Sequence, residues 1–98
     1  MHILRIEHPV RSFEEWKKVF DSDPVERQKS GVRSYRISRP VDDTNFVTVD
    51  LDFDSAEQAE ALLANLREAW KNVEGKVVIN PNTRIVEVVE MKNLQAPA

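Results

Sequence analysis

The stretch TNFVTVDLDFDSAEQAEALLANLREAW, from Thr44 to Trp70, decides the fold of this chain. From Val47 to Phe53 every second residue is apolar and the residues between are polar, which is the period of a half-buried β-strand. Ser55 then occupies the N-cap position of a helix. The apolar residues of this helix recur at helical spacing, and they are Ala59, Leu62, Leu63, Leu66, Ala69 and Trp70. We therefore predict a helix whose apolar stripe lies on the apolar face of the strand.

Length and composition limit the class of protein. The chain has 98 residues, and we expect one domain over residues 1–98 with a loose tail from about Asn93. Its 14 basic residues are dispersed and are outnumbered by 17 acidic ones, so we expect no nucleic-acid partner. Cysteine is absent, which excludes disulfides and thiolate chemistry and fits a reducing cytoplasm. Residues 1–10 lack the apolar region of a signal peptide and no apolar run approaches a membrane span, so we expect a soluble cytoplasmic protein that does not bind membranes.

A strand and a capped helix open the chain. His2–Glu7 alternates and predicts a strand with Leu4 and Ile6 on one face. Ser12 begins a helix, because Glu15 three residues later completes a capping box. The large aromatic residues of this helix share one face, and they are Phe13, Trp16 and Phe20. This face is expected to pack on the sheet.

A second helical segment is expected directly after the first. Aspartates at 21 and 23 interrupt the first helix. Asp23 can then cap a new segment, with Pro24 in its first turn, where the missing amide proton costs nothing. Gly31 is expected to end the segment in the left-handed conformation. The first helical region should therefore consist of two segments with a kink between them.

A β-hairpin is expected to follow. Val32–Arg39 predicts a strand, and the turn-forming residues 40–45 join it to the strand that follows Thr44. With the apolar faces of the two strands aligned, Arg36 is expected opposite Thr48.

The order of the elements predicts the fold class. Lys76–Ile79 predicts a short extra strand and Arg84–Met91 the last strand, which gives the order βαββαβ. We expect an α+β fold with a four-stranded antiparallel sheet and both helices on one face. The other face would leave Ile3, Phe46 and one side of the last strand uncovered. Because an open apolar patch is usually an interaction surface, we predict a homodimer in which two sheets meet face to face.

A polar cluster is expected on the same open face, and its members are Arg5, Glu7, Arg36, Thr48, Asp50 and Asp52. In one interpretation Arg5 and Arg36 pair with carboxylates on neighbouring strands, and the cluster belongs to the dimer face. In the other, Asp50, Asp52 and Asp54, spaced about 6.8 Å apart on an extended strand, bind a hard cation or move protons. The alternating signs of charge favour the first interpretation, because an unpaired buried charge is costly.

Several kinds of site can be excluded by spacing. His2 and His8 would lie roughly 20 Å apart on one strand, so they cannot share a metal ion within one chain. With two glycines in the chain there is no glycine-rich phosphate loop. We expect no metal ion and no cofactor.

The run from Phe13 to Leu63, followed by a proline loop and RIVEVVE at Arg84–Glu90, resembles small proteins of the dimeric α+β barrel superfamily. It is most similar to the group around the antibiotic biosynthesis monooxygenases, often labelled cyclases. The matching pieces are Trp16 and Phe20, Arg27 with Gly31, the turn Asp42–Asn45, the cap at Asp54 and Ser55, and the closing strand. The resemblance implies a ferredoxin-like domain that forms a dimeric α/β barrel.

The same resemblance implies several activities. The superfamily includes cofactor-independent oxygenases of polyketide-like phenols, haem-degrading enzymes, isomerases and proteins without a known reaction. The oxygenases couple an asparagine and a tryptophan one helical turn apart, whereas Asn65 and Trp70 are five residues apart here. The histidine of the haem-degrading type is missing from the later loop.

The resembling oxygenases hold their ligands between the sheet and the helices. In this region His8 could face Trp16, Tyr35 and Trp70, which would give an aromatic cleft with one group able to exchange a proton near neutral pH. The alternative is that the aromatic residues belong to the core and that His8 is an exposed loop residue.

Two functions therefore stay open. One is a small homodimeric ligand-binding or accessory protein without chemistry, which the missing catalytic pairs slightly favour. The other is a cofactor-independent monooxygenase, cyclase or isomerase of a small aromatic or polyketide-like substrate. In that case His8 would be the acid or base, and the three aromatic residues would be walls of the site.

Overall fold

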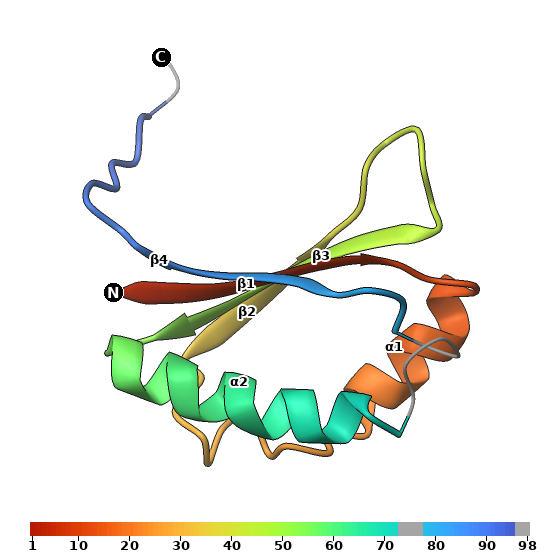
Figure 1. The fold of residues 1–98 in the computed structure, drawn as a ribbon. Coiled ribbons are helices and arrows are strands. Elements are labelled where there is room, and N and C mark those ends of the chain that lie inside the picture. The colour runs from red at the N-terminus through yellow and green to blue at the C-terminus, as the bar shows by residue number, and fades with distance from the viewer. Residues whose placement is uncertain (73–77, 96–98) are drawn as a thin grey trace.

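The structure is a computed structural model that describes residues 1–72 and 78–95. Its elements follow the expected order βαββαβ (Figure 1). They are β1 (His2–Pro9), α1 (Phe13–Asp21), β2 (Ser34–Ser38), β3 (Phe46–Phe53), α2 (Ala56–Trp70) and β4 (Asn82–Glu87). The prediction of an α+β ferredoxin-like fold is confirmed.

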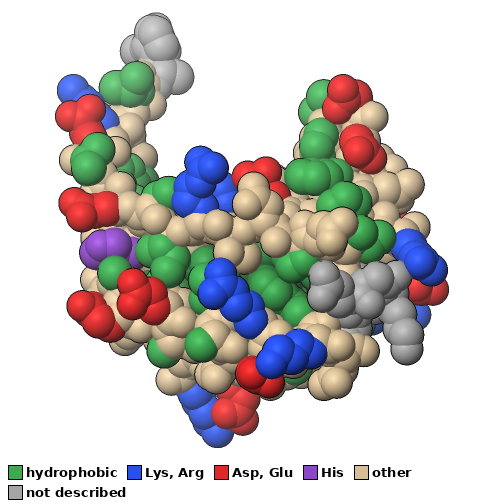
Figure 2. Space-filling model, in the orientation of Figure 1, with side chains coloured by type: hydrophobic (Ala, Val, Ile, Leu, Met, Phe, Trp, Pro, Cys, Tyr) green, Lys and Arg blue, Asp and Glu red, His purple; other side chains and the backbone are tan. Residues whose placement is uncertain are grey.

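The four strands form one sheet in the order β2-β3-β1-β4, and all neighbouring strands are antiparallel. Both helices cover the same face of the sheet, whereas the β2–β3 hairpin and the segment after β4 project on the other side (Figure 1). In Figure 2 they are two separate projections from the body of the molecule. The face between them is uncovered, and we call it the open face.

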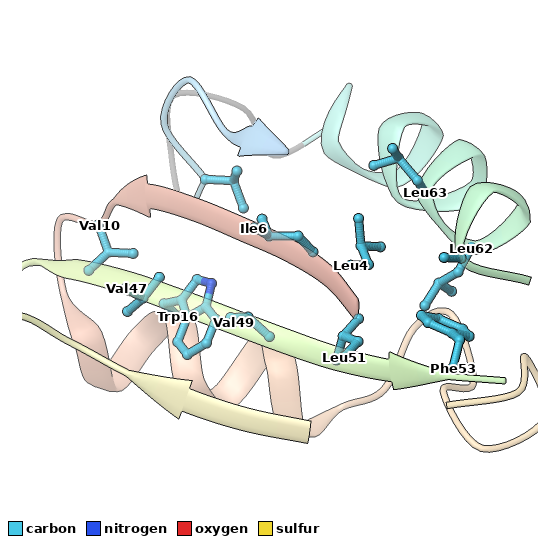
Figure 3. Packing of buried hydrophobic residues seen from close by; sticks show 12 residues of the cluster. Leu4, Ile6, Val10, Trp16, Val47, Val49, Leu51, Phe53, Leu62 and Leu63 are labelled. Carbon is cyan, nitrogen blue, oxygen red and sulfur yellow. The ribbon is translucent and has the colours of Figure 1, made fainter. Parts of the chain in front are cut away.

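The core lies between the sheet and the helices, as the alternation of β1 and β3 predicts. Ser55 caps α2 by accepting a hydrogen bond from the backbone N–H of Gln58 at 3.3 Å. The largest fully buried side chains come from β1, β3 and α2, and they are Leu4, Val47, Phe53 and Leu62. Figure 3 shows Trp16 rising from α1 towards Val49 on β3. Each such burial contributes about 1.5–3 kcal/mol to stability.

The segment after α1 differs from the expected second helix. It consists of turns, because Asp23 and Glu26 have positive φ angles of 54° and 49° that no α-helix accepts. The expected ending at Gly31 is present. Gly31 has a φ of 98°, and the N–H of Val32 donates to the carbonyl of Arg27 at 3.0 Å, as in a Schellman motif. A glycine-terminated turn therefore replaces the predicted helix.

The register of the hairpin is shifted by two residues from the expected one. Arg36 pairs with Asp50, and Ile37 pairs with Val49, so the predicted pairing of Arg36 with Thr48 is wrong. A shift of two residues keeps every side chain on its own face. The alternation of apolar residues therefore could not distinguish the two registers.

Strand β4 is shorter than predicted and ends at Glu87 instead of Met91. One further backbone hydrogen bond follows the strand, in which the N–H of Val88 donates to the carbonyl of Met1 at 3.0 Å. Beyond that point Val89 is 89% exposed. Of the predicted extra strand, the part at 76–77 lies outside the described residues, as do residues 96–98 of the predicted tail. In the described ranges no helix is long and apolar enough to cross a membrane.

Candidate functional site

A cavity of about 330 Å³ lies between the sheet and the two helices. Most of its wall is apolar and comes from β1, β3, α1, α2 and the turn segment after α1. Representative wall residues are Ile6, Val19, Val49, Leu51 and Leu66. In the view of Figure 2, hydrophobic side chains gather in the band between α2 and the sheet, and basic side chains lie over them. The volume is at the lower end of the range of small-molecule sites.

His8 is the histidine among the residues that line this cavity. It belongs to β1 and is 2% exposed, so the alternative of an exposed loop histidine is wrong. Its Nδ1 lies 2.9 Å from the carbonyl oxygen of Pro9. A carbonyl oxygen can only accept, so Nδ1 carries the proton and Nε2 carries the lone pair of a neutral imidazole. The site therefore holds a potential proton acceptor at Nε2.

Burial lowers the pKa of His8, and the hydrogen bond to the Pro9 carbonyl opposes this effect only in part. The reason is that an apolar environment disfavours the imidazolium form. The side chain is consequently neutral at pH 7, which is the state of a general base.

A row of aromatic rings extends from His8 along α1. The ring of Trp16 meets the imidazole edge to face at a centroid distance of 6.1 Å, and Phe20 stacks on Trp16 at 5.3 Å. All three side chains line the cavity. The sequence pattern placed Phe20 on the apolar stripe of its helix but gave it no role in a site.

The two remaining aromatic candidates, Trp70 and Tyr35, lie in different places. Trp70, near the end of α2, lines the cavity together with His8 and Trp16. Tyr35 is 48% exposed on the edge strand β2 and lines a neighbouring polar groove instead. Its ring contacts Phe20 edge to face at 5.1 Å. Tyr35 therefore touches the outer side of the aromatic row.

Arg27 is a wall residue of both the cavity and the polar groove. Its Cζ lies 3.9 Å from the centre of the Phe20 ring and 5.2 Å from that of Tyr35. Its Nη1 donates to the carbonyl of Phe20 at 2.7 Å and lies 3.4 Å from Oδ1 of Asp23. In the sequence analysis Arg27 is one of the pieces that carry the family resemblance, but it is not a candidate site residue. Its position depends on the turns around it, which periodicity does not describe.

The polar cluster on the open face is organised around Asp50. Arg5 donates to Asp50 from Nε at 2.8 Å, and Arg36 approaches from the other neighbouring strand with Nη2 at 3.4 Å. The expected cross-strand pairing is therefore present. The hydrogen bond from Arg5 is the main reason why the pKa of Asp50 is lowered, and the charges of both arginines add to it against the effect of burial.

The other two carboxylates of the row, Asp52 and Asp54, also accept hydrogen bonds. Ser34 donates to Asp52, and Arg33 donates to Asp54 at 2.6 Å. Glu7 and Thr48 pair across β1 and β3 on the same face. In the described part of the chain no three histidine or acidic side chains are grouped in a way that could hold a metal ion.

Comparison with known proteins identifies the fold. No protein-family model and no curated protein matches the chain. Among solved structures, a dimeric ferredoxin-like protein from an uncultured marine organism is 16% identical with a TM-score of 0.63, over 96% of this chain and 100% of that one. The "putative antibiotic biosynthesis monooxygenase" of Deinococcus radiodurans is 15% identical with a TM-score of 0.64, over 98% and 100% of the two chains.

A third similar structure is the haem-degrading protein MhuD of Mycobacterium tuberculosis, solved with two haems in its active site. It is 20% identical with a TM-score of 0.66, over 93% of this chain and 99% of that one. These structures show that the chain has the ferredoxin-like fold that the resemblance implies.

Proposed function

We propose that this protein is a homodimer that binds a small, flat, apolar ligand in the cavity between its sheet and its helices. The observation that carries the proposal is the cavity itself, in which the rings of Trp16 and Trp70 and the imidazole of His8 line one apolar space. A core that only had to be stable would fill such a space, because an empty volume forfeits packing contacts.

The size of the cavity favours a ligand of two or three fused rings. At about 330 Å³ it is small compared with the upper part of the range of ligand pockets, which extends to about 1,000 Å³. MhuD holds two haems in its active site. The volume and the apolar wall of the present cavity support a smaller aromatic ligand than a porphyrin.

The open face supports the homodimer. Ile3, Phe46 and Val86 lie there only half buried, and the projecting hairpin carries Val41 fully exposed at its turn. The segment after β4 projects on the same side (Figure 1), and its apolar residues Val89, Met91 and Leu94 are exposed. Exposed apolar side chains gathered on one side of a protein favour an interaction site there. A sedimentation-equilibrium experiment that finds a stable monomer at micromolar concentration would contradict the proposed homodimer.

We also propose a cytoplasmic location, which is inferred from the sequence.

A cavity-filling substitution tests the ligand site. Ala69 lines the cavity from α2, so Ala69→Phe should occupy the space and abolish binding. Ala64→Phe on the exposed side of the same helix is the matched control. We expect anthrone or 2-naphthol to quench tryptophan fluorescence and to raise the melting temperature in the wild type and in Ala64→Phe, but not in Ala69→Phe. Equal responses in all three proteins would place the ligand elsewhere.

A second candidate function is catalysis without a cofactor, as a monooxygenase, cyclase or isomerase. The observation that favours it is the tautomer of His8, because Nε2 of a neutral buried imidazole can remove an acidic proton from a bound phenol or ketone. Proton removal is also the first half of an isomerisation, in which the imidazolium then returns the proton to another atom of the substrate.

Deuterium exchange separates binding from catalysis. In D₂O the methylene protons of anthrone should exchange about 10²- to 10⁴-fold faster with the wild type than without protein, which is the range of general base catalysis. His8→Gln should bind anthrone and lose the acceleration. A wild-type protein that binds anthrone without accelerating the exchange would leave the ligand-binding function and remove the catalytic one for this substrate.

A further inference from the structure

We infer that the ligand of the cavity carries one carboxylate and that Arg27 binds it at the outer end of the cavity. This inference rests on the proposed ligand site and specifies the class of ligand. Arg27 is the positively charged side chain of the cavity wall, and it is shared with the polar groove outside. A molecule in the apolar cavity could therefore reach the guanidinium without leaving its apolar surroundings.

The backbone of Arg27 is fixed from both sides. Its N–H donates to Oδ1 of Asp23 at 2.9 Å, and its carbonyl accepts from the N–H of Val32 at 3.0 Å in the Schellman motif that Gly31 closes. The side chain is 14% exposed and packs against the rings of Phe20 and Tyr35. Such a guanidinium is held in place before any ligand arrives, which lowers the entropic cost of binding.

The donors of Arg27 are incompletely used. Nη1 donates to the carbonyl of Phe20, while Nε and Nη2 have no hydrogen bond to any residue in the ranges 1–72 and 78–95. Asp23 neutralises part of the charge, but its nearest oxygen is 3.4 Å from Nη1 and already accepts from the backbone N–H. A carboxylate can be bound by two parallel N–H groups of one guanidinium.

The two ends of the cavity carry different polar groups. The aromatic row runs from His8 through Trp16 and Phe20 to Arg27, with a neutral imidazole at one end and a permanent cation at the other. The walls between them are apolar. An aromatic body with a carboxylate at one end is complementary to this arrangement, because the anion would be costly to bury anywhere else in the cavity.

A pair of matched ligands tests the inference. We would titrate the wild type with 2-naphthoate and with 2-naphthamide at pH 7.5 and measure dissociation constants by tryptophan quenching. The two molecules share one ring system and differ in charge. We expect the wild type to bind 2-naphthoate at least about tenfold more tightly, since a charge-assisted pair is roughly twice as strong as a neutral hydrogen bond.

Three variants assign the preference to one residue. Arg27→Met should bind 2-naphthamide within about twofold of the wild type and lose the preference for 2-naphthoate, whereas Arg27→Lys should keep part of it. Arg33→Met is the matched control, because Arg33 lines the outer groove and is already paired with Asp54. Circular dichroism of each variant verifies that it is folded.

The outcomes distinguish this inference from the proposed function. The role of Arg27 would be overturned if the wild type bound both ligands with equal affinity. It would also be overturned if Arg27→Met and Arg27→Lys each lost affinity for 2-naphthoate and for 2-naphthamide to the same degree. In either case the cavity would remain a binding site. Suppose that the wild type binds anthrone and 2-naphthol, that Ala69→Phe binds neither of these two, and that the wild type binds neither 2-naphthoate nor 2-naphthamide. The cavity is then a site for neutral ligands, and the inference is overturned. If the wild type binds none of these molecules, the proposed function fails and this inference fails with it.

Discussion

The indole of Trp16 meets the imidazole of His8 edge to face, with ring centroids 6.1 Å apart and an angle of 62° between the ring planes. The two rings come from different elements, since His8 belongs to β1 and Trp16 to α1. This contact excludes water from one side of the imidazole and joins the sheet to the helix. It therefore connects the stability of the fold with the protonation state of the candidate site.

The first prediction concerns the dependence of stability on pH. Burial holds the pKa of His8 below its ordinary value of 6.5. Below pH 6.5 the unfolded chain therefore takes up a proton that the folded chain does not. The free energy of unfolding should fall by up to about 1.4 kcal/mol per pH unit until the folded imidazole is protonated as well. Urea unfolding between pH 7.5 and 5 measures this slope.

Two histidine variants identify the source of the slope. His8→Gln has no group to protonate at this position, so the part of the slope between pH 6.5 and 5 that belongs to His8 should disappear. His2→Gln removes a histidine from the same strand outside the cavity and should keep that slope. An unchanged slope in His8→Gln would show that burial of this imidazole does not govern the acid response.

A second prediction concerns the turn that positions Arg27. Gly31 has a φ of 98°, a conformation that other residues adopt at a cost of about 1–2 kcal/mol. A Cβ at this position would also lie 2.8 Å from Nε2 of Gln58, which can move because it ends a flexible side chain. Gly31→Ala should therefore lower the free energy of unfolding by about 1–2 kcal/mol, measured by urea denaturation.

The Gln58→Ala background separates the two causes. If the left-handed backbone is the main cost, Gly31→Ala should destabilise the Gln58→Ala protein about as much as it destabilises the wild type. A cost that vanishes in this background would instead assign the effect to the contact with Gln58. In both cases the affinity for 2-naphthoate should fall with Gly31→Ala, since the turn holds Arg27.

The sequence was a good guide wherever one periodicity determined the structure. The alternation from Val47 to Phe53 and the stripe that follows Ser55 correctly predicted which residues face the core. The end of β4 was not predictable, because the apolar, β-branched pattern continues through Val88 and Val89, whereas the strand ends at Glu87 and leaves Val89 exposed. The length of a strand depends on its neighbour, and that information is not local.

The candidate site was predictable to a smaller degree. His8, Trp16 and Trp70 were brought together by the expected helix–sheet packing. Tyr35 was expected with them but faces the outer groove, because β2 is an edge strand that the helices do not cover to its end. Arg27 was not predicted as a site residue, because positive φ angles in the preceding turns, which composition does not reveal, set its position.

A third prediction concerns Asp50, whose side chain is 8% exposed between two arginines. Asp50→Asn would leave the guanidinium groups of Arg5 and Arg36 without the charge that they share. We expect the free energy of unfolding to fall by about 1–3 kcal/mol, the usual range for hydrogen bonds to charged groups. The matched control is Asp21→Asn, which removes an exposed carboxylate paired with Lys17 on α1 and should cost less than about 1 kcal/mol.

The same residue gives an acid response distinct from that of His8. Arg5 holds the pKa of Asp50 below its ordinary value of 3.8, so the stabilisation is complete above pH 3.8 and is lost as the pH falls through the lower pKa of the folded state. In Asp50→Asn the free energy of unfolding should change less with pH in that window. Urea titrations at pH 4.5 and below compare the two proteins, and identical curves would mean that the pair with Arg5 contributes nothing in solution.

The last prediction combines Asp50 with the proposed homodimer. Asp50 lies on the open face, whereas the cavity lies on the other face of the sheet. Without its charge, Arg5 and Arg36 would present an uncompensated positive patch, and two copies meeting face to face would repel each other. We expect Asp50→Asn to weaken self-association by about tenfold in sedimentation equilibrium and to leave the affinity for 2-naphthol unchanged. Weaker binding of 2-naphthol with unchanged self-association would instead assign Asp50 to a ligand site. It would also mean that the open face is not the dimer interface.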